Sequence, residues 1–172
     1  MLTTTGNATS ATQEFIEASR IFLKDDFSPK AKHCMEAFTD EDLWWRPNEQ
    51  SNSVGNLVLH LCGNMRQWIV NSMGGGRFER NRDAEFSERK TVPKAELIAR
   101  LDQVVNEVDE ALESLSPDEL LERFPVQAYT PSRLQAIYHV VEHFSYHLGQ
   151  ILYIYKLRTG QDPGFYRHLE KK

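Results

Sequence analysis

The chain has 172 residues, of which 40% are hydrophobic and 26% are charged, a composition that suits one soluble domain with a hydrophobic core. Its formal net charge of −5 and the lack of a Lys/Arg-rich tract argue against nucleic acid as a partner. No apolar run approaches the roughly 18 residues of a membrane span, and the polar start of the chain does not resemble a secretory signal. We therefore expect a cytoplasmic protein with no membrane partner.

The first expected element follows a polar stretch, residues 1–10, that is predicted to be disordered. Residues 11–172 are predicted to form a single helical-bundle domain. Apolar side chains at helical spacing indicate a first helix, which Ser28-Pro29 can restart or kink. Its apolar positions are Phe15, Ile16, Phe22, Leu23, Cys34, Met35 and Phe38. Cys34 and the later Cys62 form no CxxC pattern, so both are expected to be reduced, partly buried thiols.

A second long helix is predicted from about Ser53 to the glycine triplet at residues 74–76. A connection with a short helical turn, residues 39–53, leads into it. His60 lies just beside the apolar arc of this helix, so its side chain is expected to point at an edge of the core. Three uncharged polar residues follow on the same flank, as expected for the lining of a pocket: Asn64, Gln67 and Asn71.

Residues 77–90, RFERNRDAEFSERK, are charged and aperiodic, which predicts a surface loop. A third helix is predicted from Pro93 to Leu115, and a capping box then starts a short helix at residues 116–119. Thr130-Pro131 is predicted to cap the last long helix, which ends near Gly160. Without any series of strand patterns, these elements predict an all-α, up-and-down bundle of four main helices.

The last helix carries three histidines at intervals of four residues, His139, His143 and His147. Four residues advance a helix by about 400°, so the three side chains form one slowly drifting stripe. His139 and His147 are separated by about 12 Å of helical rise and cannot share an ion. The apolar arc places His147 nearest the core and His139 outermost, which favours His143 and His147 as a ligand pair. His139 is then expected at the rim or behind the ligands.

His60 is the candidate for a third ligand, because flanks of facing helices can meet in a bundle. Three neutral imidazoles that leave coordination positions open are the pattern of a catalytic metal site. The alternative is that the histidines are ordinary core-edge or surface residues, and the spacing alone leaves both interpretations open. Trp44, Trp45 and Trp68 are expected in the core or sealing its joints, with the wall of a pocket as the alternative.

Two segments resemble the DinB/YfiT-like superfamily of four-helix metal-binding proteins: LWWRPNEQSNSVGNLVLHL at residues 43–61 and HFSYHLGQI at residues 143–151. The resemblance covers nearly the whole chain and is nearest to a branch known only as a domain of unknown function. It implies His60, His143 and His147 as ligands of a divalent metal, zinc or nickel. Members of the superfamily include thiol-dependent S-transferases and proteins regarded as metal-dependent hydrolases, and homodimers are common among them.

The expected function is therefore that of a divalent-metal-dependent enzyme acting on a small molecule, either an S-transferase that uses a low-molecular-weight thiol or a hydrolase. Glu142, Tyr146 and Asn64 are candidate catalytic residues for proton handling or substrate orientation, together with His139. The alternative function is that of a non-catalytic metal-binding or stress-associated helical protein.

Overall fold

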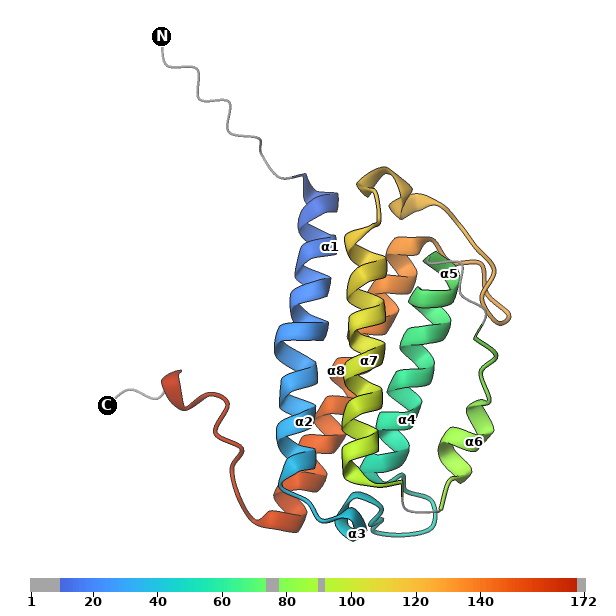
Figure 1. The fold of residues 1–172 in the computed structure, drawn as a ribbon. Coiled ribbons are helices and arrows are strands. Elements are labelled where there is room, and N and C mark those ends of the chain that lie inside the picture. Colours follow the sequence, from blue (N-terminus) through green and yellow to red (C-terminus); the bar gives the residue numbers. More distant parts are fainter. Residues whose placement is uncertain (1–9, 74–77, 90–91, 170–172) are drawn as a thin grey trace.

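The computed structural model describes residues 10–73, 78–89 and 92–169. Within these residues the chain is helical, without any strand beyond isolated bridges (Figure 1). Long helical rods form a bundle, which confirms the predicted all-α helical bundle. The first rod comprises α1 (Ala11–Ile21), a π-helical turn (Phe22–Phe27) and α2 (Ser28–Glu36), and the second comprises α4 (Val54–Met65), a π-helical turn (Arg66–Val70) and α5 (Asn71–Met73). The third rod is α7 (Lys94–Glu113) and the fourth is α8 (Arg133–Thr159).

Short helices lie between the rods and after the last one. They are α3 (Asp40–Leu43), α6 (Arg82–Ser87) and two 3-10 turns (Pro117–Leu121 and Arg167–Leu169). The glycine triplet predicted to stop the second helix lies outside the described residues, as do residues 1–9 of the predicted disordered start. Ser10 is described, and its hydroxyl caps α1 by accepting a hydrogen bond from the Gln13 N–H.

The first rod continues through Pro29 as one helix. Proline has no N–H, and its ring would collide with the carbonyl of Asp25 in regular α-helical geometry. The wider π-helical turn before it changes that register, and the Ser28 N–H bonds to the Leu23 carbonyl five residues earlier. The predicted disturbance at Ser28-Pro29 is thus a local widening of the helix.

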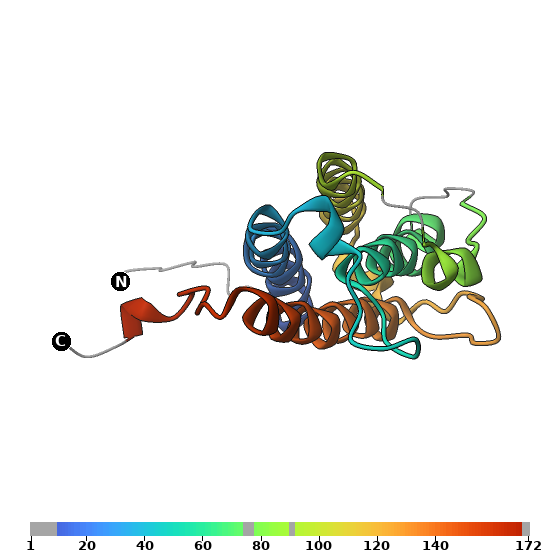
Figure 2. The ribbon, with the colours of Figure 1, turned by 90° about the horizontal axis from the view of Figure 1, so that it is seen from below.

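In the bundle, α7 and α8 each pack against both α2 and α4, so the first two rods lie on opposite corners (Figure 2). Figure 1 shows the first rod and α8 running downward and the second rod and α7 running upward. α4 and α7 are therefore parallel neighbours, and the described part of their connection, with α6, lies along the outside of α4. The four rods therefore run down, up, up and down, which departs from the predicted up-and-down order between the second and third rods.

The helices that carry the histidines have well-defined ends. The second rod starts at the predicted place, directly after Ser53, whose hydroxyl caps α4 by accepting from the Asn56 N–H. The predicted Thr130-Pro131 cap of α8 is wrong: Ser132 caps it, because Gln135 three residues later completes a capping box. Gly160 ends α8 in a left-handed conformation with φ of 66°, as the sequence indicated.

The interior holds both cysteines and part of the aromatic set. Cys34 and Cys62 are free and buried, and burial raises the pKa of each thiol to about 12. The Trp44 indole packs on Gly55 and donates to the Val92 carbonyl at 3.1 Å, so it closes the joint between the start of α4 and the segment before α7. No helix in the described residues is both long and apolar enough to cross a membrane.

Candidate metal centre

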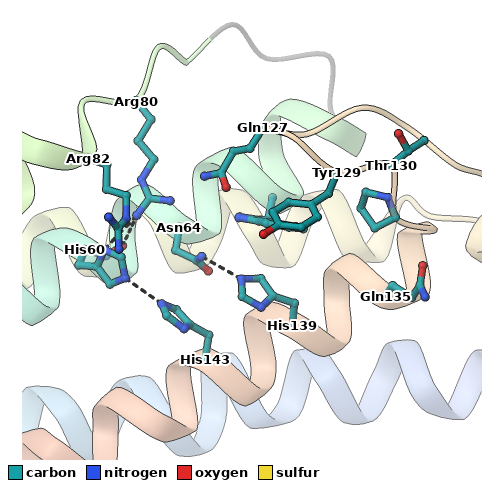
Figure 3. A pocket seen from close by; sticks show the side chains of 12 residues that line it. His60, Asn64, Arg80, Arg82, Gln127, Tyr129, Thr130, Gln135, His139 and His143 are labelled. Atoms are coloured by element: carbon teal, nitrogen blue, oxygen red, sulfur yellow. Dashed lines mark hydrogen bonds between the residues drawn. The ribbon is translucent and has the colours of Figure 1, made fainter.

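Two polar stripes face each other across the contact between α4 and α8 (Figure 3). The second rod presents residues at four-residue steps, which places them on one face: His60, Asn64 and Trp68. Because α8 runs in the opposite direction, it presents its own stripe in reverse order: His143, His139 and Gln135. His60 therefore meets His143, and Asn64 meets His139.

Three histidines converge at one end of these stripes. The Nε2 atoms of His60 and His143 lie 2.8 Å apart, and the ring centre of His147 lies 5.1 Å from that of His60 and 4.5 Å from that of His143. One ring nitrogen from each of the three lies within 4.8 Å of the others, and this is the group of metal-ligating side chains found among the described residues. The structure thus brings together the three side chains that the sequence indicated as ligands.

Hydrogen bonds on the far side of two rings determine which nitrogen faces the centre. His60 Nδ1 lies 2.9 Å from a Glu85 carboxylate oxygen, and His147 Nδ1 lies 2.8 Å from the Gln150 side-chain oxygen. Both oxygens are acceptors, so we assign the proton of each ring to Nδ1. Arg80 Nη2 also lies 3.0 Å from His60 Nδ1, but the Arg80 guanidinium is already paired with both Glu85 oxygens. With this assignment the Nε2 atom of His60 is an acceptor facing His143, and the Nε2 atom of His147 is also unprotonated. Histidines that bind metals commonly donate their other N–H to a carboxylate or carbonyl in this way.

Burial favours the neutral imidazole at two of the three histidines, His143 and His147. Burial lowers the pKa of His143 to about 3, and the nearby His147 and His60 rings add to this effect. Burial also lowers the pKa of His147, although its hydrogen bond to Gln150 opposes the shift. A neutral imidazole is the form that binds a metal ion, so the chemistry of the donors fits a borderline divalent cation.

Glu85 belongs to a buried ion pair that the sequence interpretation missed. Arg80 donates to both carboxylate oxygens at 2.7 Å, and the exposed fractions of the two side chains are 3% for Arg80 and 10% for Glu85. Burial raises the pKa of Glu85, but the hydrogen bonds from Arg80 and His60 outweigh burial, and the net pKa lies below its usual value. Both residues belong to the segment that was predicted to be a surface loop. That prediction is wrong for Arg80 and Glu85, whose side chains are buried against α4.

One sequence feature could have indicated this contact. Gly63 lies three residues after His60, on the side of α4 that α6 covers. A Cβ atom at Gly63 would lie 2.0 Å from a Glu85 carboxylate oxygen and 3.0 Å from Arg80 Nε. A glycine inside a buried helix next to a candidate ligand is a sign that another group approaches the backbone closely.

Two of the polar residues predicted to line a pocket instead bind the segment that packs on the outside of α4, residues 78–89, which we call the covering segment. The Gln67 side-chain oxygen accepts from Arg80 at 2.9 Å and from the Gln127 amide at 2.7 Å. Asn71 exchanges hydrogen bonds with the backbone of Phe78 in both directions. Gln67 and Asn71 therefore hold the covering segment against the second rod, whereas Asn64 lines the cavity.

His139 lies next to the cluster, as the helical stripe predicted for a rim residue. Its Nε2 lies 3.2 Å from the Asn64 amide nitrogen, and its ring centre lies 4.4 Å from that of Trp68 and 5.2 Å from that of His143. Burial lowers the pKa of His139, an effect that the charge of Glu142 opposes. Trp68 is at once part of the core and a wall of the cavity.

The other two candidate catalytic residues lie further out on α8. Glu142 is exposed to solvent, and Tyr146 is 60% exposed with its ring centre 5.1 Å from that of His147. Tyr146 lines a separate cavity together with Trp45 and Gln150. Their assignment to proton handling remains a prediction.

A cavity of about 620 Å³ opens beside the histidines and extends along the α4 and α8 stripes (Figure 3). Its walls include His60, Asn64 and Trp68 from the second rod and His139 and His143 from α8. The loop before α8 contributes residues 127 and 129–131, and the segment around α6 contributes two arginines. The candidate ligands His60 and His143 thus face a space large enough for a small molecule.

Comparison with known proteins gives a family and a fold. A family model described as "Protein of unknown function (DUF1572)" matches residues 10–164. No curated protein matches the chain. A DinB-like protein from Bacillus cereus has a similar crystal structure, with 16% identity, a TM-score of 0.62 and coverage of 81% of this chain and 91% of that one. A conserved protein from Enterococcus faecalis has 14% identity, a TM-score of 0.70 and coverage of 90% of this chain and 100% of that one.

Proposed function

We propose that this chain, which belongs to the DUF1572 family of proteins of unknown function, is a metal-dependent enzyme. Its divalent ion is held by His60, His143 and His147. The observation that carries this proposal is the convergence of three ring nitrogens within 4.8 Å at one end of an open cavity. The DinB-like fold of the chain, which the sequence had indicated, is compatible with it.

The donor set favours catalysis over a structural role for the metal. Structural zinc sites are usually closed by four protein ligands, whereas catalytic sites have three and leave a position for water or substrate. The group found in the described residues has three members, and two of them, His60 and His143, line the cavity. A ligand entering this cavity would therefore reach the nitrogens directly.

The residues around the centre have separable tasks in this proposal. When bound, a zinc or nickel ion would lower the pKa of a water or thiol that coordinates it. Glu85 and Gln150 orient His60 and His147, and Asn64 and His139 present polar atoms to a substrate beside the centre. Glu142 and Tyr146 are the proposed outer groups for proton handling.

The nucleophile is proposed to be water or a low-molecular-weight thiol from solution. Cys34 and Cys62 are buried, and burial raises the pKa of each thiol to about 12, so both stay protonated and are unsuitable for the reaction. The reaction is accordingly that of a thiol-dependent S-transferase or of a hydrolase. We also propose a homodimer, and light scattering that shows a monomer at micromolar concentrations would exclude it.

The proposed function is tested in two steps on the purified chain. First, zinc and nickel uptake is measured by equilibrium dialysis, with one ion per chain expected. The loaded protein is then screened with low-molecular-weight thiols and electrophiles and, separately, with simple esters and amides. Turnover that chelation abolishes supports the enzyme. Metal uptake without turnover in either screen would favour a non-catalytic metal-binding protein.

A further inference from the structure

The two arginines of the cavity differ in how their charge is matched. Arg80 is buried and its charge is balanced by Glu85. Arg82 is exposed, lines the cavity, and has its guanidinium 5.0 Å from the centre of the Phe86 ring. Within the described part of the chain no ion pair of Arg82 is found, including with its neighbour Asp83. Arg82 therefore presents a positive charge to the cavity that the described residues leave unmatched.

The cavity differs in charge from the rest of the molecule. Among the described residues that line it, none is an aspartate or a glutamate, although the whole chain has a formal net charge of −5. Its remaining polar walls are amides, hydroxyls and imidazoles. A cavity whose described walls carry an unmatched arginine and no carboxylate favours anionic small molecules over cationic ones.

Asn64 adds a second and independent sign of a ligand. The residue is only 4% exposed, and its amide nitrogen is engaged with His139. No hydrogen-bond partner of its side-chain oxygen is found among the described residues, and the side chain points toward the cavity (Figure 3). Buried carbonyl oxygens are nearly always paired, so this oxygen is available to accept a hydrogen bond from a molecule that enters the cavity, either water or a ligand.

The wall groups follow one another along the cavity in a fixed order. Phe86 contacts Arg82 and also packs on His60, with ring centres 4.5 Å apart, which places Arg82 at the histidine end. Asn64 lies one helical turn further along α4, and Trp68 lies one turn beyond it. The Trp68 and Tyr129 ring centres are 6.3 Å apart, and both rings line the cavity.

We propose that this cavity binds a small carboxylate in one orientation. Its anionic group pairs with Arg82, a hydroxyl or N–H next to that group donates to the Asn64 side-chain oxygen, and its apolar or aromatic body lies against Trp68 and Tyr129. This proposal names the substrate class of the metal-dependent enzyme proposed above and rests on that function for its catalytic meaning. The binding itself depends only on the cavity walls.

Calorimetric titration with three related probes tests the proposal. Phenyllactate has the carboxylate, the hydroxyl and the ring, phenylpropanoate lacks the hydroxyl, and phenyllactamide lacks the charge. Phenyllactate should bind most tightly, and Arg82→Gln should weaken it roughly tenfold while leaving phenyllactamide unchanged. Asn64→Leu should weaken phenyllactate but not phenylpropanoate. Arg100→Gln, a partly exposed arginine of α7 outside this cavity, is the matched control and should change nothing.

Each titration is run on zinc-loaded and on chelator-treated protein, which separates this proposal from the proposed function. Binding that depends on Arg82 in a chain that takes up no metal would support the carboxylate site and contradict the metal-dependent enzyme. If Arg82→Gln has no effect and chelation alone abolishes binding, the carboxylate coordinates the ion and the proposal is wrong. Equal binding of the acid and its amide, or no binding of phenyllactate, would likewise overturn it.

Discussion

Glu85 links the covering segment to the histidine cluster through its hydrogen bond to His60. We predict that Glu85→Gln weakens metal binding about 10–100-fold without removing a ligand, because the ring loses the charged acceptor that fixes its tautomer. Competition with a chromogenic chelator would measure the change in Kd. Asp83→Asn, on the exposed side of the same short helix, is the control and should bind metal like the unmodified protein. An unchanged Kd for Glu85→Gln would mean that His60 does not depend on this carboxylate.

Two glycines of the long helices should respond in opposite directions to replacement by alanine. A Cβ at Gly63 would collide with Glu85, so Gly63→Ala should destabilise the fold by about 1–3 kcal/mol and also weaken metal binding. Gly149 has open space around its Cβ position within α8, so Gly149→Ala should stabilise the fold by about 0.5–1 kcal/mol. Thermal unfolding of both variants gives the comparison. A Gly63→Ala protein as stable as the original would show that α6 can move away from α4 without cost.

At the scale of elements, Asp109 connects α7 to the first rod. It accepts from Arg20 at 2.8 Å and from Lys24 at 2.5 Å. Burial raises the pKa of Asp109, but the hydrogen bonds from Arg20 and Lys24 outweigh it, so the folded-state pKa is depressed. Asp109→Asn should therefore lower the free energy of unfolding at neutral pH, by about 1–2 kcal/mol.

The pH dependence of that difference follows from the direction of the shift. A carboxyl whose pKa is depressed on folding contributes its full stability above its unfolded pKa of about 3.9, and it loses that contribution as pH falls through the folded pKa. Urea unfolding of the two proteins should show a constant difference from pH 7 to about pH 5 and a shrinking one below pH 4. A difference that stays the same at pH 3 would indicate a packing effect and not an ion pair.

Elements were predictable to the extent that local periodicity determines them. The apolar arc of α8 places His147 inside and His139 at the rim, and a helical wheel is enough to obtain this order. The cap at Ser132 was misplaced by two residues, because Thr130-Pro131 is an equally good local start signal. The return of α7 parallel to α4 depends on the path of a long connection, on which periodicity has no bearing.

At the scale of the whole molecule, the fold determines which distant residues complete the site. His60 could be proposed from its flank, whereas Arg80 and Glu85 could not, because an aperiodic charged segment is normally solvated. Their burial follows from the space at Gly63 and from the anchoring by Gln67 and Asn71, which are tertiary contacts. The cavity likewise exists only once the loop before α8 is folded over the two stripes.

The metal content of four purified variants tests the central claim most directly. His60→Ala, His143→Ala and His147→Ala should each lose the bound ion, because each removes one of the three converging nitrogens. His139→Ala should keep near-normal stoichiometry, since His139 contacts Asn64 and Trp68 beside the cluster. If His139→Ala empties the site and His147→Ala does not, the ion lies one helical turn nearer the start of α8 than this account places it. Retention of metal by all four variants would exclude a histidine site altogether.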